Sequence, residues 1–299
     1  MYFPTAGVET SFFIPPLASF IVSFFMSMLG LSGAFLLIPF QISFLGYTNP
    51  SVSSTTQLYN VISNPVGALQ YAREHRMIWP LAWIIIFGGI PGVMAGALIR
   101  ITYLSDSQSF KIFVATVLLI IGAKLIQSLL SSFFSKKNIH QPIHNIESST
   151  TEVIQKSLRQ ISYTYANNSY TFSVIKTFLL SLVVGIIGGI YGIGGSAIIV
   201  PFLTSIFGLP IHTIAGAALM GSGVISVISV LFYSFLALLY PNISVAPDLL
   251  LALLFGVGGI IGMYLGAYCQ KFIPGIWLKL LMILVIFGIA VKYTLDYFQ

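Results

Sequence analysis

Two glycine-rich strings interrupt apolar stretches of this 299-residue chain, and their residue types are suited to binding an anion. One string covers Gly30–Gly33 and the other covers Gly192–Gly195. Each is expected to end one helix and to precede a second, shorter helix. The backbone N–H groups at the start of that second helix lack helical partners and carry positive potential, so they form a ready site for a negative ligand. Close helix packing is the alternative role of such small residues in a membrane protein.

Duplication of the string favours the binding role over packing alone. GLSGAFLLIPF at Gly30–Phe40 aligns with GIGGSAIIVPF at Gly192–Phe202, with glycine and proline at matching positions. A later pair, GGIPGVMAGAL at 88–98 and GGIIGMYLGAY at 258–268, also aligns. Paired broken helices that meet near the bilayer midplane are a recurring substrate-site design in secondary transporters. The sequence therefore predicts an internal duplication with one substrate site between the two strings.

Polar side chains in the stretches that follow the strings are the second set of candidates. Gln57, Asn60 and Asn64 are spaced i, i+3 and i+7, which places their amides on one helix face. Ser222 and Ser226 stand at the positions of Asn60 and Asn64 in the second copy. Such uncharged groups can orient an oxyanion while helix N-termini supply the positive potential; alternatively, they tie helices together. The predicted substrate-binding residues are Gly30, Ser32, Gly33, Gln57, Asn60, Asn64, Gly192, Gly194, Gly195, Ser196, Ser222 and Ser226.

The acidic residues all lie in or near expected loops, at Glu9, Glu74, Asp106, Glu147, Glu152, Asp248 and Asp296. A transporter of sodium or metal cations generally needs a carboxylate inside the membrane, so this pattern favours a small anion as the substrate. No metal or other cofactor is predicted. A proton stays a candidate coupling ion, although the usual relay carboxylate is missing. Lys124 and Lys292, toward the ends of their spans, either snorkel to the interface or compensate the charge of the substrate.

The composition excludes a soluble enzyme and a nucleic-acid-binding protein. Hydrophobic residues make up 57% of the chain and charged residues only 7%, with a mean hydropathy of +0.97. A soluble domain carries about 25% charged residues, so this chain could not cover a water-facing surface. The net charge of +6 comes from a few basic loop residues, as in a membrane protein oriented by Lys and Arg. With one cysteine, Cys269, neither an intrachain disulfide nor a cysteine-built zinc site is expected.

Apolar runs predict the elements that must hold these groups in place. Runs of about 20 residues can cross a bilayer as helices, whereas shorter runs are more often re-entrant or broken elements. The long runs cover 11–29, 51–71, 78–100, 108–134, 173–191, 211–239, 246–270 and 276–296, and the short runs cover 33–45 and 195–207. The predicted fold is an all-α polytopic membrane protein of two inverted repeats, each with four long transmembrane helices and one short broken or re-entrant helix. Repeat 1 is predicted at 1–134 and repeat 2 at 173–299. Residues 135–172 between them are predicted to be a polar cytoplasmic linker, with one short surface helix around Thr151–Gln160.

Basic residues in the loops predict the orientation. The 72–77 loop holds Arg73 and Arg76, and the linker begins with two lysines, so both segments are expected on the cytoplasmic side. The matching 240–247 loop has no basic residue and is expected outside. Equivalent loops on opposite sides make the repeats inverted and leave both termini outside. Arg100, beside the next loop, weighs mildly against this orientation.

Two other functional classes stay open at this level. The string Gly30–Gly33 matches GxSG, which rhomboid-type intramembrane proteases use to hold a nucleophilic serine. An intramembrane hydrolase using Ser32 would need a histidine to accept the serine proton. No histidine is predicted deep in a span, and the second copy has Gly194 instead, so an enzyme is not expected. The third class is a non-transporting membrane scaffold, which would bind a partner rather than move an anion.

The glycine break that leads into a short helix ending in Pro-Phe, at Gly30–Phe40 and Gly192–Phe202, resembles the TauE/SafE sulfite exporter family. The GxxGxxxGA strings at Gly89–Ala97 and Gly259–Ala267 add to the resemblance, which covers the chain outside the 135–172 linker.

The resemblance implies a secondary transporter, expected to be an exporter, of sulfite, organosulfonates or related small sulfur oxyanions. It also implies proton coupling in some members. The composition predicts the lipid bilayer as the surroundings, and a bacterial inner membrane is the expected location, with another cell membrane left open. This chain departs from the pattern in its first copy, where Ser32 replaces the second-copy Gly194 and Ala34 replaces Ser196. The identity of the anion is left open by these departures.

Overall fold

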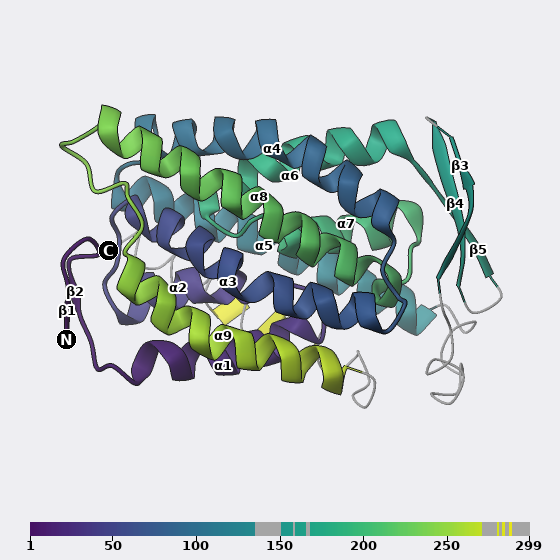
Figure 1. Ribbon diagram of the computed structural model, residues 1–299, viewed down its shortest axis with the longest axis horizontal. Coiled ribbons are helices and arrows are strands. Elements are labelled where there is room, and N and C mark those ends of the chain that lie inside the picture. Colours follow the sequence, from purple (N-terminus) through teal and green to yellow (C-terminus); the bar gives the residue numbers. More distant parts are fainter. Residues whose placement is uncertain are drawn as a thin grey trace.

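The computed structural model describes residues 1–134, 151–157, 159–165 and 168–270, together with 280, 283–284 and 287–288. Its helices are α1 (Ile14–Ser27), α2 (Ala34–Phe44), α3 (Ser51–Arg73), α4 (Trp79–Thr102), α5 (Ser107–Phe134), α6 (Val174–Tyr191), α7 (Ser196–Phe207), α8 (Ile211–Leu239) and α9 (Leu249–Cys269). Its strands are β1 (Tyr2–Phe3), β2 (Val8–Glu9), β3 (Glu152–Lys156), β4 (Gln160–Tyr165) and β5 (Asn168–Ser173). The helices lie roughly along one axis, with β1–β2 at one end and β3–β5 at the other (Figure 1). Most of the predicted span 276–296, including Lys292, lies outside the described residues.

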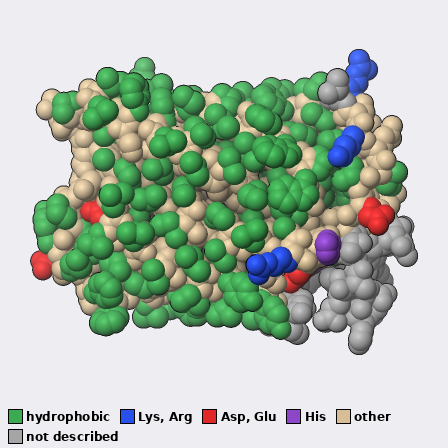
Figure 2. All heavy atoms as spheres, viewed as in Figure 1, with side chains coloured by type: hydrophobic (Ala, Val, Ile, Leu, Met, Phe, Trp, Pro, Cys, Tyr) green, Lys and Arg blue, Asp and Glu red, His purple; other side chains and the backbone are tan. Residues whose placement is uncertain are grey.

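Five helical segments in the described part are long and apolar enough to cross a membrane. They are α4, α6, α8, α9 and the Ser107–Lys124 part of α5. Their outward side chains are apolar, as Phe87 of α4 (61% exposed) and Leu231 of α8 (63% exposed) illustrate. Apolar side chains also cover most of the face seen in Figure 2. Such a surface belongs in hydrocarbon rather than in water, and the chain is an integral membrane protein.

The first helix is shorter than the sequence predicts. The 11–29 run forms a helix of only 14 residues, α1, because prolines occupy its first turn and the turn at Gly30 follows its end. The prediction of four long helices in the first half is therefore wrong for α1, which falls below the roughly 20 residues that cross a bilayer. α3 has the length of a span, with 23 residues, but it is polar and lies against α8 and α9 rather than facing outward.

The later glycine strings serve close packing between helices of the two halves of the chain. In α4, a Cβ on Gly92 or Gly96 would lie 2.3 Å from a backbone oxygen of α6. In α9, a Cβ on Gly258, Gly262 or Gly266 would come equally close to backbone or side-chain oxygens of α1. Only residues without a side chain allow these helices to approach so closely. Each of the two contacts therefore joins a helix of one half to a helix of the other half.

Hydrogen bonds at the two ends of the molecule show that α3 and α8 run in opposite directions. At the β1–β2 end, the Ser51 N–H at the start of α3 donates to the Ser244 carbonyl, 2.9 Å away, in the loop after α8. At the β3–β5 end, the Thr213 hydroxyl near the start of α8 lies 2.9 Å from the Tyr163 hydroxyl of β4. α3 thus begins where α8 ends, and the two helices lie side by side (Figure 1).

The β1–β2 end is held by one buried carboxyl group and one buried phenol. Asp248 caps α9 by accepting from the Leu251 N–H at 3.0 Å, and it also accepts from the Ala6 N–H at 3.2 Å. Burial raises the pKa of Tyr47, so its hydroxyl stays protonated and donates to Ser51 Oγ at 3.0 Å. These contacts fix the starts of α9 and α3, the helix that carries the predicted amides.

The predicted polar linker contains a three-stranded antiparallel sheet, in the order β3-β4-β5, at its described end. The surface helix expected around Thr151–Gln160 is therefore wrong. Alternation explains the strand: Ile161, Tyr163 and Tyr165 of β4 are buried at 6%, 0% and 6% exposure, while the residues between them are more exposed. Aromatic and β-branched residues with a period of two favour a strand. Because polar residues stand between them, the segment has a low average hydropathy, and the alternation is not visible in that average.

Candidate functional site

The second glycine break has a backbone that glycine alone adopts readily. Gly192, which caps the end of α6, has φ of +93°, and Gly194 and Gly195 follow with φ of +67° and +90°. A residue with a Cβ is strained in this left-handed region. α7 begins directly after the break with glycine as its N-cap, and no side chain caps it. The positive end of α7 is therefore left for another acceptor.

The first break is shaped more by space than by backbone angles. Gly30 has φ of +71°, whereas Gly33 is helical at φ of −59°. A Cβ on Gly33 would lie 2.3 Å from the Tyr59 hydroxyl and 2.7 Å from the Ser23 hydroxyl, and these hydroxyls are themselves 2.6 Å apart. A Cβ on Gly30 would lie 2.2 Å from the Cβ of Ala215. The two glycines thus let α2 begin inside the molecule, among α1, α3 and α8.

The two breaks meet in the interior. The Ser32 N–H donates to Ser196 Oγ at 3.2 Å, which joins the first break to the first residue of α7. Ser32 Oγ also accepts from the Ala34 N–H, the first residue of α2, at 3.3 Å. Ser32 and Ser196 are 0% and 1% exposed. The N-terminal ends of α2 and α7 are thus brought together away from water, where their partial positive charges favour an anion.

Amide side chains of α3 bond to the two breaks and to the helices beside them. Ser32 Oγ donates to Asn60 Oδ1 at 2.5 Å, and Asn60 Nδ2 donates to the Gly192 carbonyl at 3.5 Å. One turn earlier, Gln57 Oε1 accepts from Ser226 Oγ at 2.6 Å, and Gln57 Nε2 donates to a carbonyl of α6 at 3.2 Å. Both amides therefore hold hydrogen-bonding groups of the first half of the chain against those of the second.

Gly194 marks the point where the remaining polar groups converge. A Cβ at this position would lie 2.3 Å from Ser222 Oγ, 2.8 Å from Ser226 Oγ and 3.2 Å from the Asn60 amide nitrogen. Asn64 donates to Ser222 Oγ at 3.1 Å, and the buried Oδ1 of Asn64 has no hydrogen-bond partner. Hydroxyl and amide groups of α3 and α8 thus gather around a glycine whose missing side chain keeps their space free.

The structure divides the predicted residues into two groups. One is a buried polar set that we call the break cluster, formed by Ser32, Gln57, Asn60, Asn64, Gly194, Ser196, Ser222 and Ser226. The other comprises the glycines that shape the backbone and allow close contacts, namely Gly30, Gly33, Gly192 and Gly195. The first group has hydrogen-bonding side chains of the kind that can hold an oxyanion. The second group shapes the backbone that positions those side chains.

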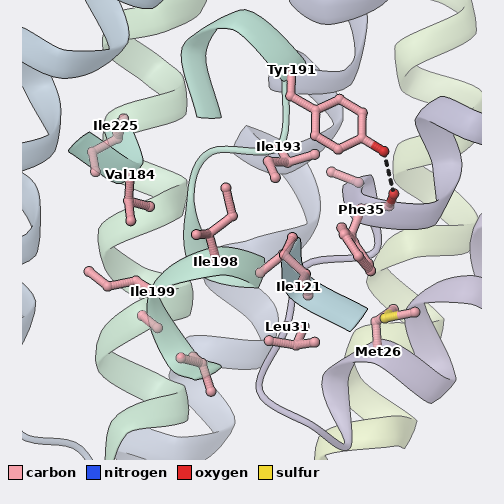
Figure 3. Packing of buried hydrophobic residues seen from close by; sticks show 14 of the residues in the cluster. Met26, Leu31, Phe35, Ile121, Val184, Tyr191, Ile193, Ile198, Ile199 and Ile225 are labelled. Atoms are coloured by element: carbon pink, nitrogen blue, oxygen red, sulfur yellow. Dashed lines mark hydrogen bonds between the residues drawn. The ribbon is translucent and has the colours of Figure 1, made fainter. Parts of the chain in front are cut away.

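Apolar side chains surround the break cluster. Leu31 and Ile193, which lie inside the two breaks, are 2% and 0% exposed. Figure 3 shows them among other buried apolar residues such as Ile198, with the Tyr191 hydroxyl donating to the Phe35 carbonyl at 3.3 Å. The side chains of the break cluster are at most 1% exposed, so the conformation is a closed one. Electrostatic attraction is stronger in such a low-dielectric interior than in water.

The surroundings of Ser32 do not match those of a nucleophile. Its hydroxyl donates to the amide oxygen of Asn60 at 2.5 Å. A carboxamide does not take up a proton at neutral pH, so this pair lacks the general base that an intramembrane hydrolase requires. Among the described residues, no group of three or more His, Cys, Asp or Glu is placed to hold a metal ion.

Sequence reasoning missed a buried arginine beside the break cluster. Arg100 of α4 is 0% exposed, and its Nε donates to Ser53 Oγ at 3.4 Å. Ser53 in turn donates to the Ile190 carbonyl near the end of α6, at 3.0 Å. The signal was present as a charge inside the last turn of an apolar run. Arginines at that place commonly determine topology, and nothing in the sequence distinguishes Arg100 from them.

Comparison with known proteins decides the family. The family model "Sulfite exporter TauE/SafE" matches residues 16–293, which is most of the chain. The chain belongs to the TauE/SafE family. No solved structure matches it. In this TauE/SafE protein the match includes both glycine breaks, α3 and α8, so the whole break cluster lies within the family region.

Curated relatives of this TauE/SafE protein are named as membrane transporters. The chain is 27% identical over 192 residues to "Probable membrane transporter protein YunE" of Bacillus subtilis. This alignment covers 62% of this chain and 64% of that protein. The chain is also 25% identical over 247 residues to a "Probable membrane transporter protein" of Xylella fastidiosa. That alignment covers 82% of this chain and 80% of the Xylella protein. The match thus spans just under two thirds of the Bacillus protein and most of the Xylella protein.

Proposed function

We propose that this TauE/SafE protein is a secondary transporter that moves a small sulfur oxyanion, such as sulfite or a sulfonate, across a bacterial inner membrane. The observation that carries the proposal is the contact between the two breaks, where Ser32 of one donates to Ser196 at the start of α7. The anion takes a place between the starts of α2 and α7, where it accepts from the hydroxyls and amides of the break cluster. Export is the proposed direction, in line with the name of the family.

An alternating-access mechanism fits the closed conformation of the break cluster. In the described conformation Asn60 joins the two breaks by direct hydrogen bonds, and Gln57 holds α3 against α6 and α8. A bound oxyanion would accept from several of these donors at once, and each opening movement would separate the cluster from one end of the molecule. Transport then depends on differences in how tightly the open and closed states bind the anion.

Two inverted repeats are part of the proposal. Support comes from the opposite directions of α3 and α8, which follow the two breaks at equivalent places in the chain. The starts of α1 and α6 also lie at opposite ends, since α1 follows the β1–β2 hairpin and α6 follows β5 (Figure 1). Two such halves would give the site one gate toward each side of the membrane.

The end that carries β3–β5 is proposed to be cytoplasmic. In the view of Figure 2, Lys and Arg side chains lie toward this end. The basic residues at this end include Arg73, Arg76, Lys156, Arg159 and Lys176. An excess of Lys and Arg on the cytoplasmic side is the general rule for membrane proteins. Export then runs from the β3–β5 end to the β1–β2 end.

Proton coupling is proposed to act through the substrate. The described helices α1–α9 contain no Asp or Glu, so they offer no carboxylate to relay a proton within the membrane. A proton that moves with the anion would therefore travel on the anion, as in hydrogen sulfite. Under this proposal, a sulfonate without an acidic proton at neutral pH moves without coupling.

Anion flux in proteoliposomes tests the proposed function. The purified protein is reconstituted, and uptake of sulfite, of a sulfonate such as sulfoacetate and of a carboxylate of similar size is measured with and without a pH gradient. Saturable flux of a sulfur oxyanion is expected, and the gradient should accelerate sulfite but not the sulfonate. Flux of the carboxylate alone would contradict the substrate class. Folded protein that moves none of the three anions would refute the transport proposal and favour a scaffold.

A further inference from the structure

The most unusual charge in the described part of the molecule is Arg100. It lies in the last turn of α4 and is 0% exposed, although a charged side chain inside a membrane protein is costly to bury. Most of the other Lys and Arg residues of the described part lie at least partly exposed; Arg76, which is 5% exposed, pairs with Glu74. Burying the charge of Arg100 is costly, and a paired carboxylate, such as Glu74 provides for Arg76, would offset that cost.

No carboxylate of the described residues pairs directly with Arg100, although Asp106 in the loop after α4 is near enough to attract it. Its Nη1 donates to the Leu104 carbonyl, its Nε donates to Ser53 Oγ at 3.4 Å, and its Cζ lies 3.7 Å from the centre of the Phe110 ring. The buried Nη2 has no hydrogen-bond partner. Within the described residues no carboxylate lies in ion-pair distance of Arg100. A buried guanidinium with a free N–H₂ and no directly paired carboxylate is prepared to receive a negative ligand.

The position of Arg100 connects it to the second break. Ser53, its partner, donates to the Ile190 carbonyl and packs so closely on Gly192 that a Cβ there would lie 2.7 Å from the Ser53 Cα. Tyr233 of α8 donates to the Gly189 carbonyl at 2.9 Å in the same region. Arg100 is therefore linked through Ser53 to the start of the second break, on the β1–β2 side of the break cluster.

We propose that Arg100 is the cationic residue that pairs with the transported oxyanion on the β1–β2 side of the break cluster. The proposal rests on the proposed transport function and adds to it the positive side chain that the break cluster lacks. Arginine suits this role better than lysine because its planar fork can donate two parallel hydrogen bonds to one oxyanion. An anion leaving the break cluster toward the β1–β2 end would meet Nη2 of Arg100 and the hydroxyl of Ser53.

Two substitutions of Arg100 test this inference, with Arg76→Gln as the matched control. Arg76 is also buried, at 5% exposure, but it lies at the opposite end and binds Glu74 and Gln270. In proteoliposomes, Arg100→Gln should raise the KM for sulfite about 10- to 100-fold, the usual effect of losing a charge-assisted pair. Arg100→Lys keeps the positive charge but loses the planar guanidinium, so its KM for sulfite should lie between those of Arg100→Gln and the native protein. Arg76→Gln should change the amount of folded protein but not the KM.

Sulfite binding to the detergent-solubilised protein gives a second readout, independent of transport. Sulfite should raise the thermal unfolding midpoint of the native protein and of Arg76→Gln, and do so less for Arg100→Lys and least for Arg100→Gln. If Arg100 only anchors the end of α4, both Arg100 variants will lose stability while their KM and sulfite response stay native, and the inference is overturned. Absence of flux and of stabilisation in the native protein would instead refute the proposed function itself.

Discussion

Replacing Asn60 with aspartate changes one buried amide into a carboxyl group of the same shape. The new side chain can still accept from Ser32 Oγ, as Asn60 does at 2.5 Å, so the contact with the first break is kept. What is lost is the donation from Nδ2 to the Gly192 carbonyl, which is long at 3.5 Å and therefore weak. The change mainly adds a negative charge to the break cluster.

Coulomb's law gives the size of the effect on a bound anion. Two like charges about 4 Å apart repel by about 4 kcal/mol at an effective dielectric constant of about 20, which corresponds to roughly a 1000-fold loss of affinity. Partial neutralisation by protons would reduce this, but about 1.4 kcal/mol already produces a tenfold loss. Asn60→Ala removes hydrogen bonds without adding charge and should cost about 1–2 kcal/mol of binding energy. The expected order of sulfite affinity is native, then Asn60→Ala, then Asn60→Asp.

Ser63→Ala is the matched control for these variants. Ser63 is buried in the same helix at 0% exposure, but its hydroxyl donates to the Tyr59 carbonyl of its own helix at 2.9 Å. Sulfite flux and sulfite-induced thermal stabilisation are measured for all four proteins. Ser63→Ala should keep the native KM. Native sulfite affinity in Asn60→Asp would refute the placement of the anion in the break cluster.

Three further predictions concern the break, the helix packing and the orientation. Gly194→Ala should lower transport strongly, because its φ of +67° costs a residue with a Cβ about 1–2 kcal/mol and the Cβ would lie 2.3 Å from a serine hydroxyl; native flux in this variant would contradict the closed geometry. Gly262→Leu should lower the thermal unfolding midpoint of the detergent-solubilised protein, because even a Cβ at this position would lie 2.4 Å from a backbone oxygen of α1; an unchanged midpoint would show that α1 and α9 are not in this close contact. In a Cys269→Ser background, a cysteine at Asn242 should react with an impermeant maleimide added to intact cells, whereas one at Lys156 should react only after the cells are opened. The reverse pattern of labelling would overturn the proposed orientation.

Much of the helical framework follows from hydropathy because a membrane helix needs little besides length and apolar residues. The apolar run at 211–239 predicts α8 with the same first and last residues that the structure shows. α1 is shorter than its predicted run because single proline and glycine residues determine where a helix begins and ends. The average hydropathy of the run does not depend on such single residues. β4 was missed for a related reason. Its buried Tyr163 and Tyr165 alternate with polar residues, so the segment has the average composition of a solvated linker.

The break cluster was partly predictable because its spacing is local. Gln57, Asn60 and Asn64 share a helix face by arithmetic alone, and the duplicated glycine strings locate the two breaks. Pairing between the halves depends on three-dimensional contact, as in the bond from Ser32 N–H to Ser196 Oγ, and sequence spacing cannot provide it. Arg100 was missed because a charge at the end of an apolar run has the same appearance whether it is solvated or buried.

Direct location of a bound anion tests the central claim of an oxyanion site between the two breaks. Selenite has the shape and charge of sulfite, and its selenium atom can be located by anomalous X-ray scattering in crystals of the protein. The expected result is one strong anomalous peak between the two breaks, placed so that the selenite oxygens accept hydrogen bonds from the Ser32 and Ser196 hydroxyls and the Asn60 amide. Selenium only at surface lysines, at concentrations that saturate sulfite transport, would contradict the site.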